Sequence, residues 1–280
     1  MNAPLPLTAT LPRDLPGWMR LFDVRAIPVS AATAEQIEAL RPDEDDIDAH
    51  RLAPLLEHDP LMVVRLLAHV GALRRGRDLG TPETVVEALV MLGITPFFRT
   101  FAALPTIEEA LQDQPQALAG YLAVLDRSYR GARYAMAFAV HRMDPDAEVI
   151  REATLLHDFA ELLLWWRAPA AALAIADRQR ADPALRSAVA QREVLGIELA
   201  DLEQALMRRW QLPPMLARIT DDHHAEDVRV RNVVLALRVA RHTARGWDNP
   251  ALPDDIDDVG RLLNLGAAPA LRLLHDIEDE

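Results

Sequence analysis

The sequence TLLHDFAELLLWW, residues 154–166, is the most informative part of this chain. Its apolar side chains recur at helical spacing and form one broad face, which is typical of a buried helix. That face consists of Leu155, Leu156, Phe159, Leu162, Leu163 and Trp166. The polar side chains form a second stripe, made of Thr154, His157, Asp158 and Glu161. We therefore expect one uninterrupted helix that places a His–Asp pair among apolar residues.

The pair His157–Asp158 needs an explanation, because an ionised carboxylate is costly to bury unless it is paired or bound to a metal. In one interpretation both side chains are metal ligands, an imidazole nitrogen and a carboxylate oxygen that suit Zn, Mn or Fe. In the other, Asp158 accepts hydrogen bonds from helix N-termini or from an arginine, and His157 is a hydrogen-bonded core histidine. The pair alone favours the second interpretation, and the rest of the chain has to discriminate between them.

The composition indicates the fold class. The 280 residues are 50% hydrophobic and 26% charged, which allows one large domain or two smaller ones with their own cores. Ala, Leu, Arg and Glu dominate, glycine occurs only 11 times, and alternating Val-Ile-Thr segments are nearly absent. These frequencies favour helices, so we expect an all-α fold.

The charge and the termini exclude several classes of protein. A net charge of −13, from 43 acidic and 30 basic residues, disfavours direct binding to nucleic acid or to an anionic membrane. The chain has no cysteine, which excludes disulfides, thiolate nucleophiles and Cys-ligated zinc. Residues 1–16 lack the pattern of a secretory signal, and no apolar run is long enough to span a bilayer. We therefore predict a cytoplasmic protein.

Start and stop signals divide the chain into helices. Residues 1–26 form an arm that we expect to be partly disordered, with an apolar knot at 18–22 that either caps the core or docks a partner. The acidic run 43–46 is interpreted as the start of the next helix rather than as a calcium site. The expected helices cover residues 30–40, 47–57, a segment from 60, 82–93, 95–103, 115–143, 145–168, 170–181, 183–195, 198–210, a segment up to 224, 228–246, 254–265 and 268–280.

Six short motifs carry a resemblance to a known family. They are DP at 59–60 with RLL at 65–67, ALVMLG at 88–93, LLHD at 155–158, Glu193 ahead of LG at 195–196, WQLP at 210–213 and HH at 223–224. In this order they resemble the HDOD family, the HD-related output domain of bacterial signalling proteins. The resemblance covers residues 27–246 and implies an N-terminal helical bundle packed on a degenerate HD-like bundle. It implies an N-terminal subdomain at 27–114, an HD-like subdomain at 115–250 and C-terminal helices at 251–280.

The family is distantly similar to HD metal-dependent phosphohydrolases, which bind metal through an early His, the adjacent His-Asp and a late Asp. The resemblance places the early and late positions at Arg130 and Arg241. An arginine cannot release its proton to bind a metal, so it would pair with Asp158 instead. The lysine that usually follows His-Asp is also missing, and Glu161 would repel a phosphate ester. The resemblance thus implies a degenerate metal site, without catalytic residues or a cofactor.

The sequence DDHH at 221–224 could bind a transition metal if it converges with the His-Asp pair. The alternative ligand set is His157, Asp158, His223 and His224. The competing interpretation is a solvated helix end, where histidines are favoured by the helix dipole.

A second cluster, YRGARY at 129–134, could stack on and clamp an anionic, nucleotide-like ligand. Alternatively, Tyr134 packs in the core while Arg130 and Arg133 serve Asp158 and surface acids. The sequence favours the second interpretation.

We therefore predict a non-catalytic bacterial signal-transduction module of HDOD type. It would bind a protein partner of a signalling pathway or a small anionic ligand, with Arg130, Arg133, His157 and Asp158 as candidate binding residues. The alternative is a divergent metal-dependent HD-type phosphohydrolase that uses Mn, Fe or Zn to act on a nucleotide or phosphate ester. A purely structural scaffold is a third possibility.

Overall fold

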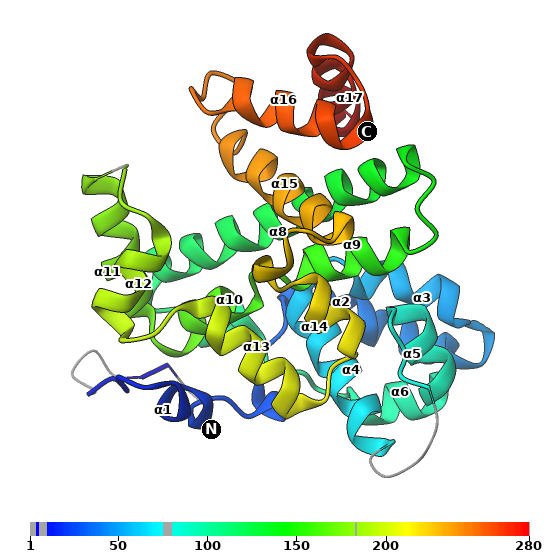
Figure 1. Cartoon of the computed structure of the whole chain (residues 1–280). Helices are drawn as coiled ribbons and strands as arrows, with labels where there is room; N and C mark the ends of the chain where they lie inside the picture. The colour runs from blue at the N-terminus through cyan, green and yellow to red at the C-terminus, as the bar shows by residue number, and fades with distance from the viewer. Residues whose placement is uncertain (1–3, 6–9, 75–79, 183, 280) are drawn as a thin grey trace. The chain divides into compact units, whose positions relative to one another are not determined.

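A computed structural model describes residues 4–5, 10–74, 80–182 and 184–279, and every regular element in these ranges is a helix (Figure 1). The predicted all-α class is therefore confirmed. The chain divides into two compact units. Unit 1 comprises Met1–Leu125 and Asp158–Pro213, and unit 2 comprises Asp126–His157 and Pro214–Glu280. Each unit thus combines two segments that are distant in the sequence, and the subdomain boundaries given above remain predictions.

Unit 1 contains most of the helices. They are α1 (Leu15–Arg20), η1 (Val24–Ala26), α2 (Ala31–Leu40), η2 (Arg41–Asp46), α3 (Ala49–Leu56), α4 (Pro60–Leu73), α5 (Val85–Leu92), α6 (Ile94–Thr100), α7 (Ile107–Ala110), the first part of α8 (Pro115–His141), α10 (Phe159–Arg167), α11 (Pro169–Ala181), α12 (Ser187–Leu195) and α13 (Leu199–Trp210). The labels η mark short 3₁₀ helices.

Helix caps explain where several of these helices begin and end. The Thr33 backbone N–H donates to the Ser30 side chain at the start of α2. Asp59 caps α4 by accepting the backbone N–H groups of Leu61 and Met62, with Pro60 in the first helical position. Both features follow the preference of small polar residues for N-caps and of proline for the first turn. These two starts were predicted from the sequence and are confirmed.

The acidic run at 43–46 behaves differently from the prediction. It lies within η2, and α3 begins only after Asp48, whose side chain accepts the Arg51 backbone N–H at 2.8 Å. Asp48 satisfies one of the free N–H groups of the first turn, so it is the cap of α3. The prediction that this run starts the next helix is therefore wrong, because the run forms the short 3₁₀ helix η2 ahead of α3.

The apolar knot at 18–22 belongs to the core of unit 1. Trp18 and Phe22 are completely or almost completely buried. The Trp18 indole Nε1–H donates to the Leu195 carbonyl oxygen at 3.0 Å, which ties the knot to the end of α12. This confirms the interpretation of the knot as a cap on the core. Part of the arm that we expected to be disordered lies outside the described residues.

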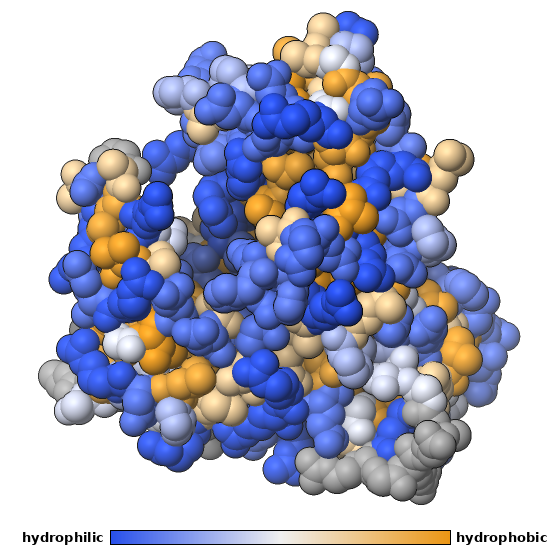
Figure 2. All heavy atoms as spheres, in the orientation of Figure 1, coloured by the Kyte–Doolittle hydropathy of each residue, from blue (hydrophilic) through white to orange (hydrophobic). Residues whose placement is uncertain are grey.

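Unit 2 is built from fewer helices. They are the remainder of α8, α9 (Ala147–Leu156), α14 (Pro214–Ile219), η3 (Asp222–His224), α15 (Val228–His242), α16 (Leu252–Leu263) and α17 (Ala267–Asp279). α15 packs against α9, α14 and α16, and α16 packs against α17. Tyr134 and Phe138 of α8 are buried in the core of this unit. Figure 2 shows apolar atoms exposed among polar ones over α15.

No single helix in the described ranges is both long enough and apolar enough to cross a bilayer. By length and composition alone, one sharply bent pair of segments, 147–167 with 169–181, passes the same test.

Candidate functional site

The His157–Asp158 pair lies at a break between two helices. α9 ends at Leu156 and α10 begins at Phe159. The His157 backbone N–H donates over 3.4 Å to the Thr154 carbonyl oxygen, which lies three residues back rather than four. Asp158 has the non-helical angles φ −110° and ψ 18°. The prediction of one uninterrupted helix through this pair is therefore wrong.

Asp158 occupies the N-cap position of α10, and its carbonyl oxygen accepts the backbone N–H groups of Glu161 at 3.0 Å and Leu162 at 3.3 Å. Its side chain forms no capping hydrogen bond with the first turn of α10, so this cap is made by the backbone. The polar stripe expected along one helix is split here, and the division into two units falls at the same peptide bond.

His157 reaches the short helix η3. Its Nε2 atom lies 2.9 Å from Oδ1 of Asp222, whose side chain is half exposed. Asp222 belongs to the DDHH sequence singled out above. The structure therefore brings His157 to the predicted segment, but its partner there is a carboxylate and not a histidine.

The two histidines of this segment lie beside other carboxylates. His223 Nδ1 is 2.8 Å from Asp221 Oδ1, and His224 lies 3.7 Å from Asp221 and 3.4 Å from Glu226. Burial acts to raise the pKa of Asp221, but the hydrogen bonds from His223 and the charges of both histidines outweigh burial and lower that pKa. The segment is thus a small network of hydrogen bonds around Asp221.

These donors do not fit a metal centre. Within the ranges that the structure describes, no group of three or more His, Asp or Glu side chains is placed to hold a metal ion. Protein metal sites of the kind found in hydrolases use at least three such ligands. The alternative ligand set His157, Asp158, His223 and His224 gains no support from this geometry, and metal binding by the chain stays untested.

Arg130 of α8 belongs to an ion-pair network. Its guanidinium pairs with the Glu278 carboxylate of α17 and donates to the Ala240 carbonyl oxygen at 3.1 Å and to the Thr243 hydroxyl. The Tyr134 hydroxyl also donates to Glu278, at 2.7 Å. The network links α8 to α15 and α17 inside unit 2.

The pKa values within this network reflect both burial and charge. Burial acts to raise the pKa of Glu278, but the hydrogen bonds from Tyr134 and Arg130 outweigh burial and lower it. Burial raises the pKa of Tyr134, and its hydrogen bond to Glu278 adds to the shift. Glu278 is therefore a carboxylate and Tyr134 a neutral phenol around pH 7.

Arg133 and Arg241 complete the residues singled out from the sequence. The Arg133 guanidinium donates to the Ile277 carbonyl oxygen, and Arg241 is exposed near the end of α15. Ligand binding by Arg130 and Arg133 would require their contacts with α17 to open, and it stays a prediction. Pairing of Arg130 or Arg241 with Asp158 also stays a prediction, since Asp158 belongs to the other unit.

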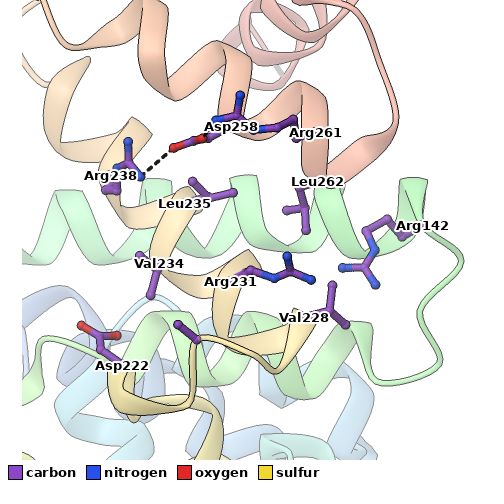
Figure 3. Close-up of a pocket in the computed structure, with 11 residues that line it drawn as sticks. Arg142, Asp222, Val228, Arg231, Val234, Leu235, Arg238, Asp258, Arg261 and Leu262 are labelled. Carbon is purple, nitrogen blue, oxygen red and sulfur yellow. Dashed lines mark hydrogen bonds and ion pairs between the residues drawn. The ribbon is translucent and has the colours of Figure 1, made fainter.

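Unit 2 contains a cavity of about 480 Å³ that was not predicted from the sequence (Figure 3). Its walls come from α15, α16, the end of α8 and the segment around η3, and they include four arginines. Two of them, Arg231 and Arg238, are seven residues apart on α15 and therefore share one face of that helix. This spacing was visible in the sequence, but nothing in the sequence showed that Arg142, directly after α8, would join them.

Comparison with protein families gives one clear match. The HDOD domain model matches residues 27–226, which is most of the chain. Among curated protein sequences, none matches this chain.

Comparison with solved structures finds the same fold. The MmoQ response regulator from Methylococcus capsulatus str. Bath has a TM-score of 0.65 at 20% sequence identity, covering 89% of this chain and 98% of that chain. A virulence factor from Campylobacter jejuni subsp. jejuni has a TM-score of 0.61 at 16% identity, covering 94% of this chain and 98% of that chain. At such identities the similarity is one of fold.

Proposed function

The chain belongs to the HDOD family, and on that premise we propose that it is a non-catalytic regulatory module of bacterial signal transduction. It acts by binding a protein partner of a signalling pathway or a small anionic ligand. The response regulator with the same fold supports a regulatory role, although its description applies to that protein.

The surroundings of His157 carry this proposal. A metal-dependent phosphohydrolase needs several His and Asp ligands around each ion, which then activates water and neutralises the phosphate. Here the His157 imidazole is hydrogen-bonded to Asp222, and the nearby histidines pair with Asp221 and Glu226. Arg130, at the position that the resemblance assigns to the early metal-binding His, is a cation paired with Glu278. This arrangement favours binding over hydrolysis.

The test combines metal analysis with an activity assay. We expect purified chain to contain less than about one equivalent of Mn, Fe or Zn. We also expect it to leave a generic phosphodiester intact when each metal is added. A bound metal together with hydrolysis that is lost in His157→Ala would contradict the proposal. His50→Ala, which removes an exposed histidine of unit 1, is the matched control and should change nothing.

The binding role is tested separately. Immobilised full-length chain should retain one specific protein from an extract of its own host, or a small molecule that mass spectrometry detects after denaturation. Recovery of neither would favour the purely structural scaffold. The result does not depend on the metal assay, so the two halves of the proposal can fail independently.

A further inference from the structure

The cavity in unit 2 has an unusual charge balance. Four arginines and two aspartates line it, which gives a formal charge of +2 in a chain whose net charge is −13. Most of its walls lie beyond residue 226, where the match to the HDOD family ends. The cavity is therefore formed chiefly by α15 and α16.

Two of the four arginines are already neutralised. Arg238 donates to the carboxylates of Asp255 and Asp258, the latter at 3.0 Å. Arg261 pairs with the same Asp258. Because an arginine stays protonated at any working pH, these carboxylates compensate most of the charge on this side of the cavity.

The other two arginines are not compensated in this way. The Arg231 side chain forms no hydrogen bond or ion pair with any residue in the described ranges. Nη2 of Arg142 lies 3.9 Å from the nearest carboxylate, Asp144, and Nη1 is buried without a hydrogen-bond partner among the described residues. Figure 3 shows the two guanidinium ends turned toward the same space. One arginine without a side-chain partner and one with only a 3.9 Å ion pair face one space, and together they favour an anion between them.

The remaining walls are apolar. Val228, Val234, Leu235 and Leu262 line the cavity together with Arg142 and Arg231. A volume of about 480 Å³ is typical of sites for small organic ligands. Asp222 and Asp258 also line the cavity, but Asp258 is paired with Arg238 and Arg261, and Asp222 is hydrogen-bonded to His157.

From this geometry we infer that the cavity binds a small organic oxyanion, with one phosphate or carboxylate group between Arg142 and Arg231 and a compact apolar body against the leucine and valine walls. The inference names the ligand class for the proposed binding function and rests on that function. An inorganic anion would leave the apolar walls unused.

Calorimetric titration of the full-length chain tests the inference. The probes are phenyl phosphate, benzoate, inorganic phosphate and phenol. We expect saturable 1:1 binding of phenyl phosphate or benzoate, about tenfold weaker binding of inorganic phosphate, and none of phenol. The tighter of the two aromatic anions identifies the head group. Affinity should fall as salt is raised, because the site is partly open to solvent.

Variants locate the binding. Arg231→Gln and Arg142→Gln should each weaken binding of the aromatic anion by about tenfold or more. Leu262→Ser should weaken that binding and leave inorganic phosphate unchanged. Arg245→Gln, an exposed arginine in the turn after α15, is the matched control and should bind normally. Circular dichroism confirms that each variant is folded.

Two results would overturn the inference. One is no saturable binding of either aromatic anion by the native chain. The other is binding that is equally strong in native protein and in folded Arg231→Gln and Arg142→Gln. In either case the proposed regulatory function would survive, since a protein partner can bind elsewhere. Release of phenol from phenyl phosphate would contradict the proposed non-catalytic function. The inference that the cavity binds an anion would survive that result.

Discussion

Asp59 in unit 1 and Asp255 in unit 2 are both completely buried carboxylates, and they are stabilised in different ways. In unit 1, Asp59 accepts backbone N–H groups from Ser30, Leu61 and Met62. In unit 2, Asp255 is held by the side chains of Arg238 and His242. The backbone donors around Asp59 fix the position of a helix start. The free energy of the ion pair around Asp255 depends instead on how far water is excluded from the two charges. The first carboxylate serves the fold, and the second positions a cation beside a cavity.

The difference extends beyond these two residues. The core of unit 1 includes large aromatic side chains such as Trp18, Phe97, Phe98 and Trp166, all buried. Unit 2 joins its helices through ion pairs, among them Arg130–Glu278 and Arg229–Asp146. Unit 1 thus has the features of a hydrophobic scaffold, whereas unit 2 carries the charged groups that we propose for ligand binding.

The largest effect is expected from Asp59→Ala in unit 1. The change leaves three buried backbone N–H groups without their acceptor, which should lower the free energy of unfolding by about 3 kcal/mol. Asp48→Ala removes an exposed cap of the same chemistry and should cost only about 1 kcal/mol. Denaturant titration measures both losses. Equal losses would show that burial of Asp59 adds nothing to its role as a cap.

Asp255→Ala in unit 2 should lower the stability of the protein and raise the affinity of its cavity for an anion. It breaks two ion pairs and should lower the free energy of unfolding by about 2 kcal/mol. It also frees Arg238 from one carboxylate, which should increase the affinity of the cavity for phenyl phosphate several-fold. Calorimetry on the folded variant measures the affinity. A weaker affinity for phenyl phosphate would mean that Asp255 mainly holds Arg238 in a binding orientation, and does not mainly neutralise its charge.

A double-mutant cycle compares ion pairs in the two units. For Arg130→Gln and Glu278→Gln we expect a coupling energy of about 1 kcal/mol, because both side chains are mostly buried. Arg178 and Glu193 of unit 1 are about half exposed, and the same cycle there should give less than about 0.5 kcal/mol. Similar values for both pairs would remove the distinction between the units.

The smallest effect concerns pH and Asp227, the N-cap of α15. The hydrogen bond from the Arg229 side chain lowers the pKa of Asp227 from 3.8 to about 2 in the folded protein. The carboxylate therefore contributes stability above pH 3.8, and this contribution is lost as the pH falls through about 2. Asp227→Asn should be less stable than native protein by under about 1 kcal/mol at pH 6. The difference in stability between native protein and Asp227→Asn should disappear as the pH falls toward 2 in an acid unfolding titration. A difference that grows there would contradict the lowered pKa of Asp227.

Much of the fold could be predicted because its signals are local. Ser30, Asp59 and Gly93 mark helix ends through their own side chains or, at Gly93, through a backbone φ of 86° that favours glycine. The break at His157–Asp158 was missed because the apolar periodicity continues through it. Periodicity shows which side chains are buried, but it does not reveal one irregular peptide within the run.

The site was less accessible to prediction, because its contacts are distant in the sequence. Arg130 and Glu278 are 148 residues apart, and nothing local marks them as partners. Convergence of His157 and the DDHH segment was considered from the sequence only as a condition for metal binding, and the structure places Asp222, not a histidine, beside His157. The cavity is lined by Arg142, which follows α8, and by arginines of α15 and α16, and only the pair on α15 shares a spacing that a sequence can show.

Phosphorus NMR of phenyl phosphate, mixed with the native chain and Zn²⁺, tests most directly whether this protein binds rather than cleaves. The account predicts a resonance that shifts or broadens on binding while the ester stays intact over hours. The contradicting result is a growing signal of inorganic phosphate that appears with native protein and is absent with His157→Ala.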